Sequence, residues 1–172
     1  MHVDELAALV GTEAGQELAS ALGRIQHCLQ QLTDEQVWWR ARPDMNGIGN
    51  LILHLCGNVR QWIIAGLGDA TDMRNRPAEF AERGPIPKAD LLRQLEAVVT
   101  EAQTVLKRQS AEDLLAVRCI QGFETTGLGA IFNSVPHFRG HTQEIIHMTR
   151  SQLGAAYRFA WQPQTTAEGA PV

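Results

Sequence analysis

The sequence predicts an all-α protein, a four-helix bundle with one long crossover connection. Apolar residues recur at helical spacing in four long segments, signals for strands are few, and no internal repeat is visible. A chain of 172 residues is long enough for one domain with its own core. We therefore expect a single domain over residues 1–161 and a flexible C-terminal tail over residues 162–172.

The first long helix is expected from about residue 12 to residue 32. Its apolar residues recur at steps of four and three: Leu18, Leu22, Ile25, Leu29 and Leu32. Thr33 is a good capping residue, and Gln36 three positions later completes the start pattern of a short second helix. This short helix contains two adjacent indoles, Trp38 and Trp39, of which we expect one to pack inward and the other to lie near the surface.

The second long helix is expected to begin near Asn46, a good capping residue, and to end near Gly66 or Gly68. Residues 67–87 then form the long crossover connection. A loop of this length in a small domain is usually functional or loosely ordered.

The third long helix is expected over about residues 87–109, and the fourth is expected to end near Leu153. Between these helices, residues 117–123 have the pattern of extended chain, and Gly122 marks a turn. After the fourth helix, we expect the aromatic residues from Tyr157 onward to dock this segment on the bundle.

The composition argues against nucleic-acid and membrane partners. The 15 basic and 19 acidic residues give a formal net charge of −4, whereas binding to nucleic acid needs a basic surface. No apolar run approaches the roughly 20 residues of a transmembrane helix, and the N-terminus shows no secretory signal. The three cysteines are far apart and lack the spacing of a disulfide framework or a zinc ribbon. We therefore expect a cytoplasmic protein.

Two histidines make the fourth helix a candidate metal-binding element. His137 and His141 are four residues apart, so their imidazoles lie on one helix face, one turn from each other, and Glu144 continues this face. Two imidazoles on successive turns can supply two ligands to one metal ion without distortion of the backbone. The alternative is a chance spacing among the 6 histidines, with both side chains simply solvated.

A third nitrogen ligand is available from the second long helix. His54 lies at the edge of an apolar stripe, and its own face carries Asn50, Asn58 and Gln61. Three neutral nitrogen ligands with an open position are the pattern of a catalytic zinc site, although nickel, iron or manganese would also fit. The alternative for His54 is a histidine at the core boundary that an asparagine holds by a hydrogen bond. Cys56 lies about 200° around the helix from His54, so we expect a buried structural thiol there.

The segments Asn50–Asn58 and Val135–Ile146 resemble the DinB-like superfamily, in particular the branch in which one early histidine precedes a late H-x-x-x-H motif. The resemblance covers about residues 12–161 in helix order and spacing. It implies a four-helix bundle of the DinB-like type, often dimeric, in which three histidines hold a divalent metal ion. The corresponding residues in this chain are His54, His137 and His141.

Two positions differ from the pattern of the superfamily. Relatives often have an acidic residue where this chain has Asn58, and a glycine–glutamine pair where it has Gln143 and Glu144. We expect Glu144 to act in catalysis, either by taking a thiol proton or by holding a ligating imidazole through its second nitrogen. We expect Asn58 to act as an outer hydrogen-bonding group. A solvated helix residue is the alternative for Glu144.

Characterised members of the superfamily imply a reaction. They include S-transferases that use bacillithiol or mycothiol and a mycothiol-dependent isomerase, and others are described as metal-dependent hydrolases. We therefore expect a thiol-dependent S-transferase with zinc or nickel as cofactor, and with a small thiol and an electrophilic substrate as partners. A hydrolase that uses metal-bound water is the first alternative. A non-catalytic metal- or ligand-binding dimerisation module is the second.

Three arginines are candidates for binding an anionic thiol or substrate: Arg60, Arg74 and Arg76. For each of them an ordinary surface charge is the favoured interpretation, because most arginine side chains in proteins are solvated.

Overall fold

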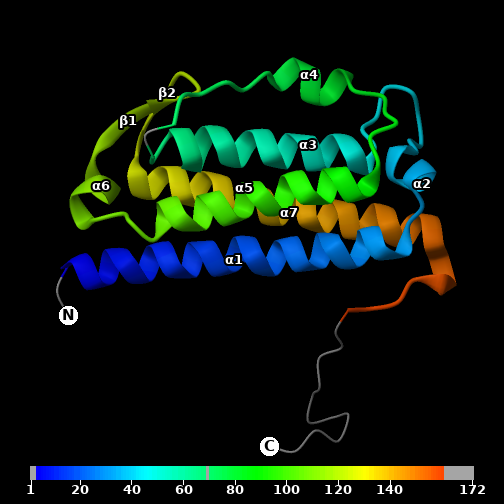
Figure 1. Cartoon of the computed structure of the whole chain (residues 1–172), viewed down its shortest axis with the longest axis horizontal. Helices are drawn as coiled ribbons and strands as arrows, with labels where there is room; N and C mark the ends of the chain where they lie inside the picture. The colour runs from blue at the N-terminus through cyan, green and yellow to red at the C-terminus, as the bar shows by residue number, and fades with distance from the viewer. Residues whose placement is uncertain (1–2, 69, 161–172) are drawn as a thin grey trace, which may run out of the picture.

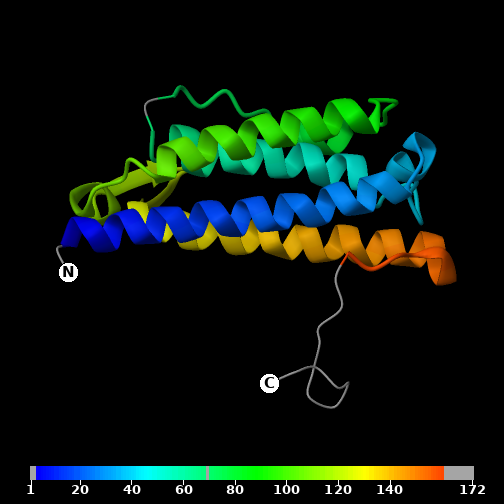
Figure 2. The same ribbon diagram turned by 60° about the horizontal axis from the view of Figure 1, so that its bottom comes forward.

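Four long helices lie side by side in the computed structural model, which describes residues 3–68 and 70–160 (Figure 1). They are α1 (Val3–Gln31), α3 (Ile48–Val59), α5 (Lys88–Leu106) and α7 (Gly127–Leu153). Helix α1 packs against α5 and α7, and α3 packs against the same two helices. Turned by 60°, the bundle shows α1 beside α7 and α3 beside α5 (Figure 2). The all-α four-helix architecture predicted from the sequence is confirmed.

Short helices and two strands lie between the long helices in the sequence, and one short turn follows the last of them. They are α2 (Asp34–Trp38), the π-helix η1 (Arg60–Ala65), α4 (Arg76–Ala81), α6 (Ala111–Leu115), β1 (Val117–Ile120), β2 (Phe123–Thr126) and the 3₁₀ turn η2 (Gly154–Ala156). The π-helix continues α3 without a break. The connection from η1 to α5 carries α4, which contacts α3 and lies on its outer side (Figure 1). No helix in the described ranges combines the length and the apolar character that crossing a bilayer requires.

The first helix begins at Val3, well before the expected residue 12. The reason is that its N-terminal half buries small residues, Ala7, Gly11 and Ala14, instead of a stripe of large apolar ones. At Gly11 the backbone of α5 comes so close that an added Cβ would lie 2.1 Å from the carbonyl oxygen of Leu106. Small residues therefore set the contact between α1 and the end of α5.

Replacement of Gly11 by Ala is expected to lower the free energy of unfolding by about 1–3 kcal/mol, because overpacking outweighs the gain in helix propensity. Chemical denaturation of the purified variant measures this change. Gly23→Ala is the matched control in the same helix, since its Cβ would meet no atom within 4 Å. That control should gain about 0.5–1 kcal/mol. Equal stability of the two variants would contradict the close contact.

The start of α3 differs by one residue from the expected start. Gly47, not Asn46, is the capping residue, and the side-chain oxygen of Asn50 accepts a hydrogen bond from the Gly47 N–H at 3.2 Å. The predicted cap of α2 is confirmed, since the Thr33 side chain accepts a hydrogen bond from the Gln36 backbone N–H.

The two indoles of the α2 region divide as expected. Trp38 is 9% exposed and donates from its ring nitrogen to the carbonyl oxygen of Ile86, whereas Trp39 is 49% exposed.

The extended stretch expected over residues 117–123 is the first part of a hairpin. Strands β1 and β2 pair antiparallel, with Ile120 opposite Phe123. Gln121 and Gly122 between them have φ of 55° and 79°, the positive values that a type I′ turn requires. The sequence pattern indicates extended chain here, but it does not show that the chain turns back on itself.

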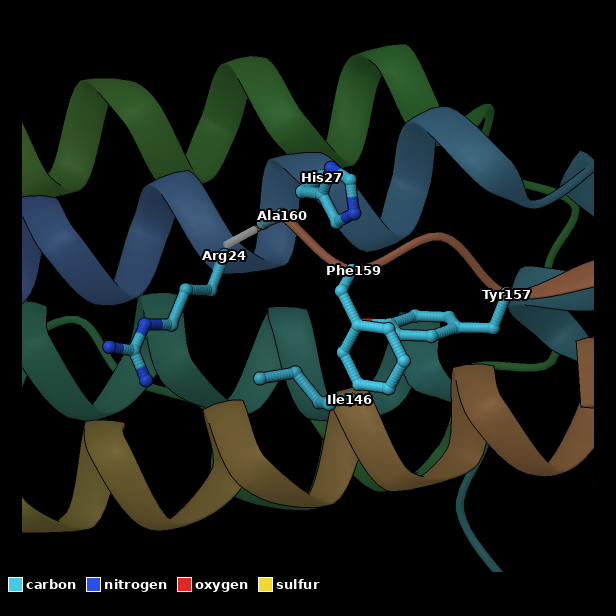
Figure 3. A pocket seen from close by; sticks show the side chains of 6 residues that line it. All are labelled: Arg24, His27, Ile146, Tyr157, Phe159 and Ala160. Atoms are coloured by element: carbon cyan, nitrogen blue, oxygen red, sulfur yellow. The ribbon is translucent and has the colours of Figure 1, made fainter. Parts of the chain in front are cut away.

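Aromatic residues after α7 dock on the bundle, as expected. Arg150 lies over the rings of Tyr157 and Phe159, at 5.9 and 5.1 Å from their centroids. Figure 3 shows these two rings beside His27 of α1, where with Arg24, Ile146 and Ala160 they line a pocket of about 350 Å³. The flexible tail expected over residues 162–172 lies outside the described residues.

Candidate metal centre

Three histidines meet between α3 and α7. His54 comes from the middle of α3 and is 5% exposed, whereas His137 and His141 come from successive turns of α7 and are partly exposed. The Nε2 atoms of His54 and His137 are 2.9 Å apart, and the ring centroids of His137 and His141 are 4.5 Å apart. One nitrogen from each of the three rings lies within 4.8 Å of the other two. The structure therefore brings together the three residues that the sequence singled out.

The donor set suits a divalent transition metal. Two nitrogen ligands at about 2.0–2.1 Å from a tetrahedral zinc ion lie roughly 3.3 Å apart, so the observed nitrogen positions need only small side-chain rotations to share one ion. Burial, together with the charges of His141, His54, Arg74 and Arg76, lowers the pKa of His137 to about 4. His137 is thus neutral at pH 7, which metal ligation requires. The cluster can hold a divalent metal ion.

The second ring nitrogen of His54 is held by a carboxylate from the long connection. The Nδ1 atom of His54 lies 2.9 Å from Oε2 of Glu79, which belongs to α4. Nδ1 also lies 3.1 Å from Nη2 of Arg74. A carboxylate only accepts hydrogen bonds, so with the proton on Nδ1 the ring donates to Glu79, and the lone pair of Nε2 then points at the cluster. Glu79 therefore orients the His54 ring.

A buried arginine balances the charge of Glu79. Arg74 donates from Nε to Oε1 of Glu79 at 2.8 Å and from Nη2 to Oε2 at 2.9 Å, and its Nη1 donates to Oε1 of Gln61 at 2.9 Å. Burial raises the pKa of the Glu79 carboxyl, but the hydrogen bonds and charges of Arg74 and His54 outweigh it and lower the pKa overall. The side chain of Arg74 is only 3% exposed, so its interpretation as a surface charge is wrong.

Two residues, Gly57 of α3 and Gln61 of the π-helix that continues it, allow this connection to pack closely against the helix that carries His54. Gln61, in the π-helix, accepts from Arg74 and donates to Oδ2 of Asp72 at 2.8 Å. At Gly57, one turn after His54, an added Cβ would lie 1.9 Å from Oε1 of Glu79. Only glycine leaves room for the carboxylate against this face of α3.

The sequence singled out Arg74 and Arg76 of the connection as candidates, but it did not identify Glu79 or the contact of Glu79 with His54. The signals in the connection were the capping Asn75 followed by Pro77, a typical helix start. The unusual length of the connection was the other signal. Neither signal shows which helix face α4 covers, so Glu79 and the pairing of Arg74 with it were missed.

The two predicted catalytic residues have different surroundings. Oε2 of Glu144 lies 2.8 Å from Nδ1 of His141, and the Glu144 side chain is 49% exposed. Asn58 is 5% exposed, and its Oδ1 accepts a hydrogen bond from the hydroxyl of Ser134 at 2.9 Å, which links α3 to α7. The catalytic role of both residues stays a prediction.

The remaining candidates behave as the sequence suggests. Arg60 is a surface residue whose side chain is 54% exposed and lies 3.5 Å from Glu101. Arg76 is exposed, with its guanidinium 4.9 Å from the ring centroid of Phe80. Cys56 is buried, and burial raises the pKa of its thiol to about 12, as a structural thiol requires.

The model of one protein family matches residues 12–165, that of the Protein of unknown function (DUF1572). The chain belongs to the DUF1572 family. No protein of curated function matches this DUF1572 sequence.

Solved structures show the same fold. A conserved protein from Enterococcus faecalis superposes with a TM-score of 0.69 at 18% identity, over 90% of this chain and 99% of that one. A DinB-like protein from Bacillus cereus ATCC 10987 superposes with a TM-score of 0.61 at 16% identity, over 80% of this chain and 89% of that one. The two superpositions show that this DUF1572 protein shares its fold with a DinB-like protein. At such identities the likeness establishes the fold alone.

Replacement of Gly57 by Ala is expected to weaken zinc binding by about 10- to 100-fold, although it changes no ligand. The new methyl group would displace Glu79 from His54, and loss of such a partner typically costs this much affinity. Competition with a chromophoric chelator measures the affinity.

Gly140→Ala is the matched control, because Gly140 adjoins His141 and a Cβ there would meet no atom within 4 Å. This variant should bind zinc as the wild type does. Wild-type affinity in Gly57→Ala would show that Glu79 does not support His54.

Proposed function

We propose that this protein binds a divalent metal ion, zinc or nickel, through His54, His137 and His141 and activates a small thiol for attack on an electrophilic substrate. The observation that carries the proposal is the convergence of three imidazole nitrogens within 4.8 Å, with two of the rings partly exposed. Imidazole ligands suit both metals. A dication held by three neutral nitrogens keeps a position for an incoming ligand and lowers the pKa of a thiol or water that binds there.

The protein's own residues orient the ligands and handle the proton. Glu79 contacts Nδ1 of His54, on the side of the ring away from the cluster. Arg74 keeps the buried Glu79 carboxylate charged. Glu144 contacts His141 and is half exposed, so it is positioned both to orient that ring and to accept a proton from an incoming thiol. Asn58, tied to Ser134, keeps α3 and α7 in register beside the histidines.

Hydrolysis at the same site is the alternative. Among the described residues, the carboxylates in contact with the three histidines are Glu79 and Glu144. Glu79 is committed to Arg74, so Glu144 remains as the single candidate for proton transfer. Attack by a thiol needs one proton acceptor, whereas hydrolysis benefits from a base for water and an acid for the leaving group. This difference favours the thiol reaction.

The expected partners follow from the same proposal. They are a small thiol and an electrophile, and we further propose a homodimer, as the resemblance to the superfamily implies, and a cytoplasmic location, as the cysteine pattern indicates. A metal- or ligand-binding dimerisation module without catalysis is the second alternative, and it would use the same three histidines.

The cobalt-substituted protein is expected to develop a thiolate-to-cobalt charge-transfer absorption when 2-mercaptoethanol is added. With a panel of electrophiles, such as 1-chloro-2,4-dinitrobenzene and monobromobimane, it should consume the thiol catalytically. His54→Ala removes one of three ligands and should abolish both signals. His147→Ala, an exposed histidine of the same helix as the other two ligands, is the control and should retain them.

Three other results would count against the proposal in different ways. Hydrolysis of activated esters without added thiol would favour the hydrolase. Binding of metal and thiol without turnover of any electrophile would favour the binding module. Absence of the charge-transfer band in the loaded wild type would contradict thiol activation itself.

A further inference from the structure

Arg76 stands at the edge of the three-histidine cluster. It opens α4, after the capping Asn75, and its guanidinium lies 4.9 Å from the centroid of the Phe80 ring. The Phe80 ring in turn lies 4.9 Å from the ring centroid of His54. Phe80 thus contacts both Arg76 and His54. The charge of Arg76 also acts on His137, whose pKa it helps to lower.

The two arginines of this segment differ in how their charge is used. Arg74 is buried and makes hydrogen bonds to Glu79 and Gln61. Arg76 is exposed, and within residues 3–68 and 70–160 no carboxylate pairs with it. Stacking on an aromatic ring limits its motion without neutralising its charge. Arg76 is therefore a positioned cation that is free to bind an anion.

The net charge around the histidines favours binding of such an anion once a metal ion is present. Glu79 and Glu144 contact the histidines, and their two negative charges equal in number the positive charges of Arg74 and Arg76. Of these two arginines, only Arg74 is paired with a carboxylate among the described residues. The histidines are neutral ligands, so the charge of a bound dication would remain uncompensated. A thiolate would neutralise half of it. A second negative group on the same ligand would neutralise the other half.

Resting on the proposed function, we propose that Arg76, stacked on Phe80, selects thiols that carry a second, anionic group: a carboxylate, phosphate or sulfonate near the sulfur. The planar guanidinium forms paired hydrogen bonds to the oxygens of such groups. Arg76 is then a specificity-determining residue, which binds ligand but takes no part in holding the metal.

Two thiols of similar size test the proposal with the cobalt-substituted full chain: 2-mercaptoethanesulfonate, which is anionic, and 2-mercaptoethanol, which is neutral. Sulfonates coordinate metals poorly, so a preference for the anionic thiol reports on the protein. The charge-transfer absorption gives the dissociation constant of each thiol. Arg76→Gln should weaken binding of the anionic thiol by about three- to tenfold and leave the neutral thiol unchanged.

Two further variants control for charge and for geometry. Arg93→Gln removes the same charge from an exposed position on α5 and should leave both dissociation constants unchanged. Arg76→Lys keeps the charge without the planar fork and should fall between the wild type and Arg76→Gln. In the wild type, the preference for the anionic thiol should shrink as the ionic strength rises.

The outcomes separate this inference from the proposed function. If the neutral thiol binds and Arg76→Gln weakens both thiols equally, or neither, then Arg76 does not select for charge and the inference is overturned while thiol activation stands. If neither thiol binds the cobalt-loaded wild type, thiol activation fails and this inference fails with it.

Discussion

The buried carboxylate of Glu79 connects the long crossover segment to the helix that carries His54, and the arrangement of the site depends on it. A carboxylate in this position would be costly without partners. Arg74 donates to both of its oxygens, and His54 lies 2.9 Å from one of them. This single group thus orients the ring of a candidate ligand and anchors α4. Through α4, it also places Phe80 and Arg76 beside the histidines.

The bundle supplies the rest of the centre with little local distortion. His137 and His141 need only the regular spacing of α7, and His54 needs only that α3 packs beside it. The π-helix after α3 brings Gln61 to the connection, and π-helical turns are frequent at functional sites. The long helices therefore hold the three imidazoles, while a shorter, polar segment adjusts their electrostatics.

Local sequence patterns were sufficient to predict the long helices and the candidate metal ligands. The four long helices and the three histidines follow from periodicity, and the resemblance to the DinB-like superfamily points to the same residues. Glu79, and the role of Arg74 as its partner, could not be found in this way, because both depend on how the connection folds back over α3. The early start of α1 was missed for a related reason, since Gly11 packs through its lack of a side chain and gives no apolar signal.

Metal content is the measurement that tests the central claim most directly. The protein, purified without a histidine tag and titrated with zinc or nickel, should retain about one equivalent per chain in elemental analysis. The double variant His137→Ala, His141→Ala should retain none, while His147→Ala should match the wild type. Failure of the wild type to bind any divalent ion, even after titration, would show that the three histidines serve packing and solvation, and the metal centre described above would be refuted.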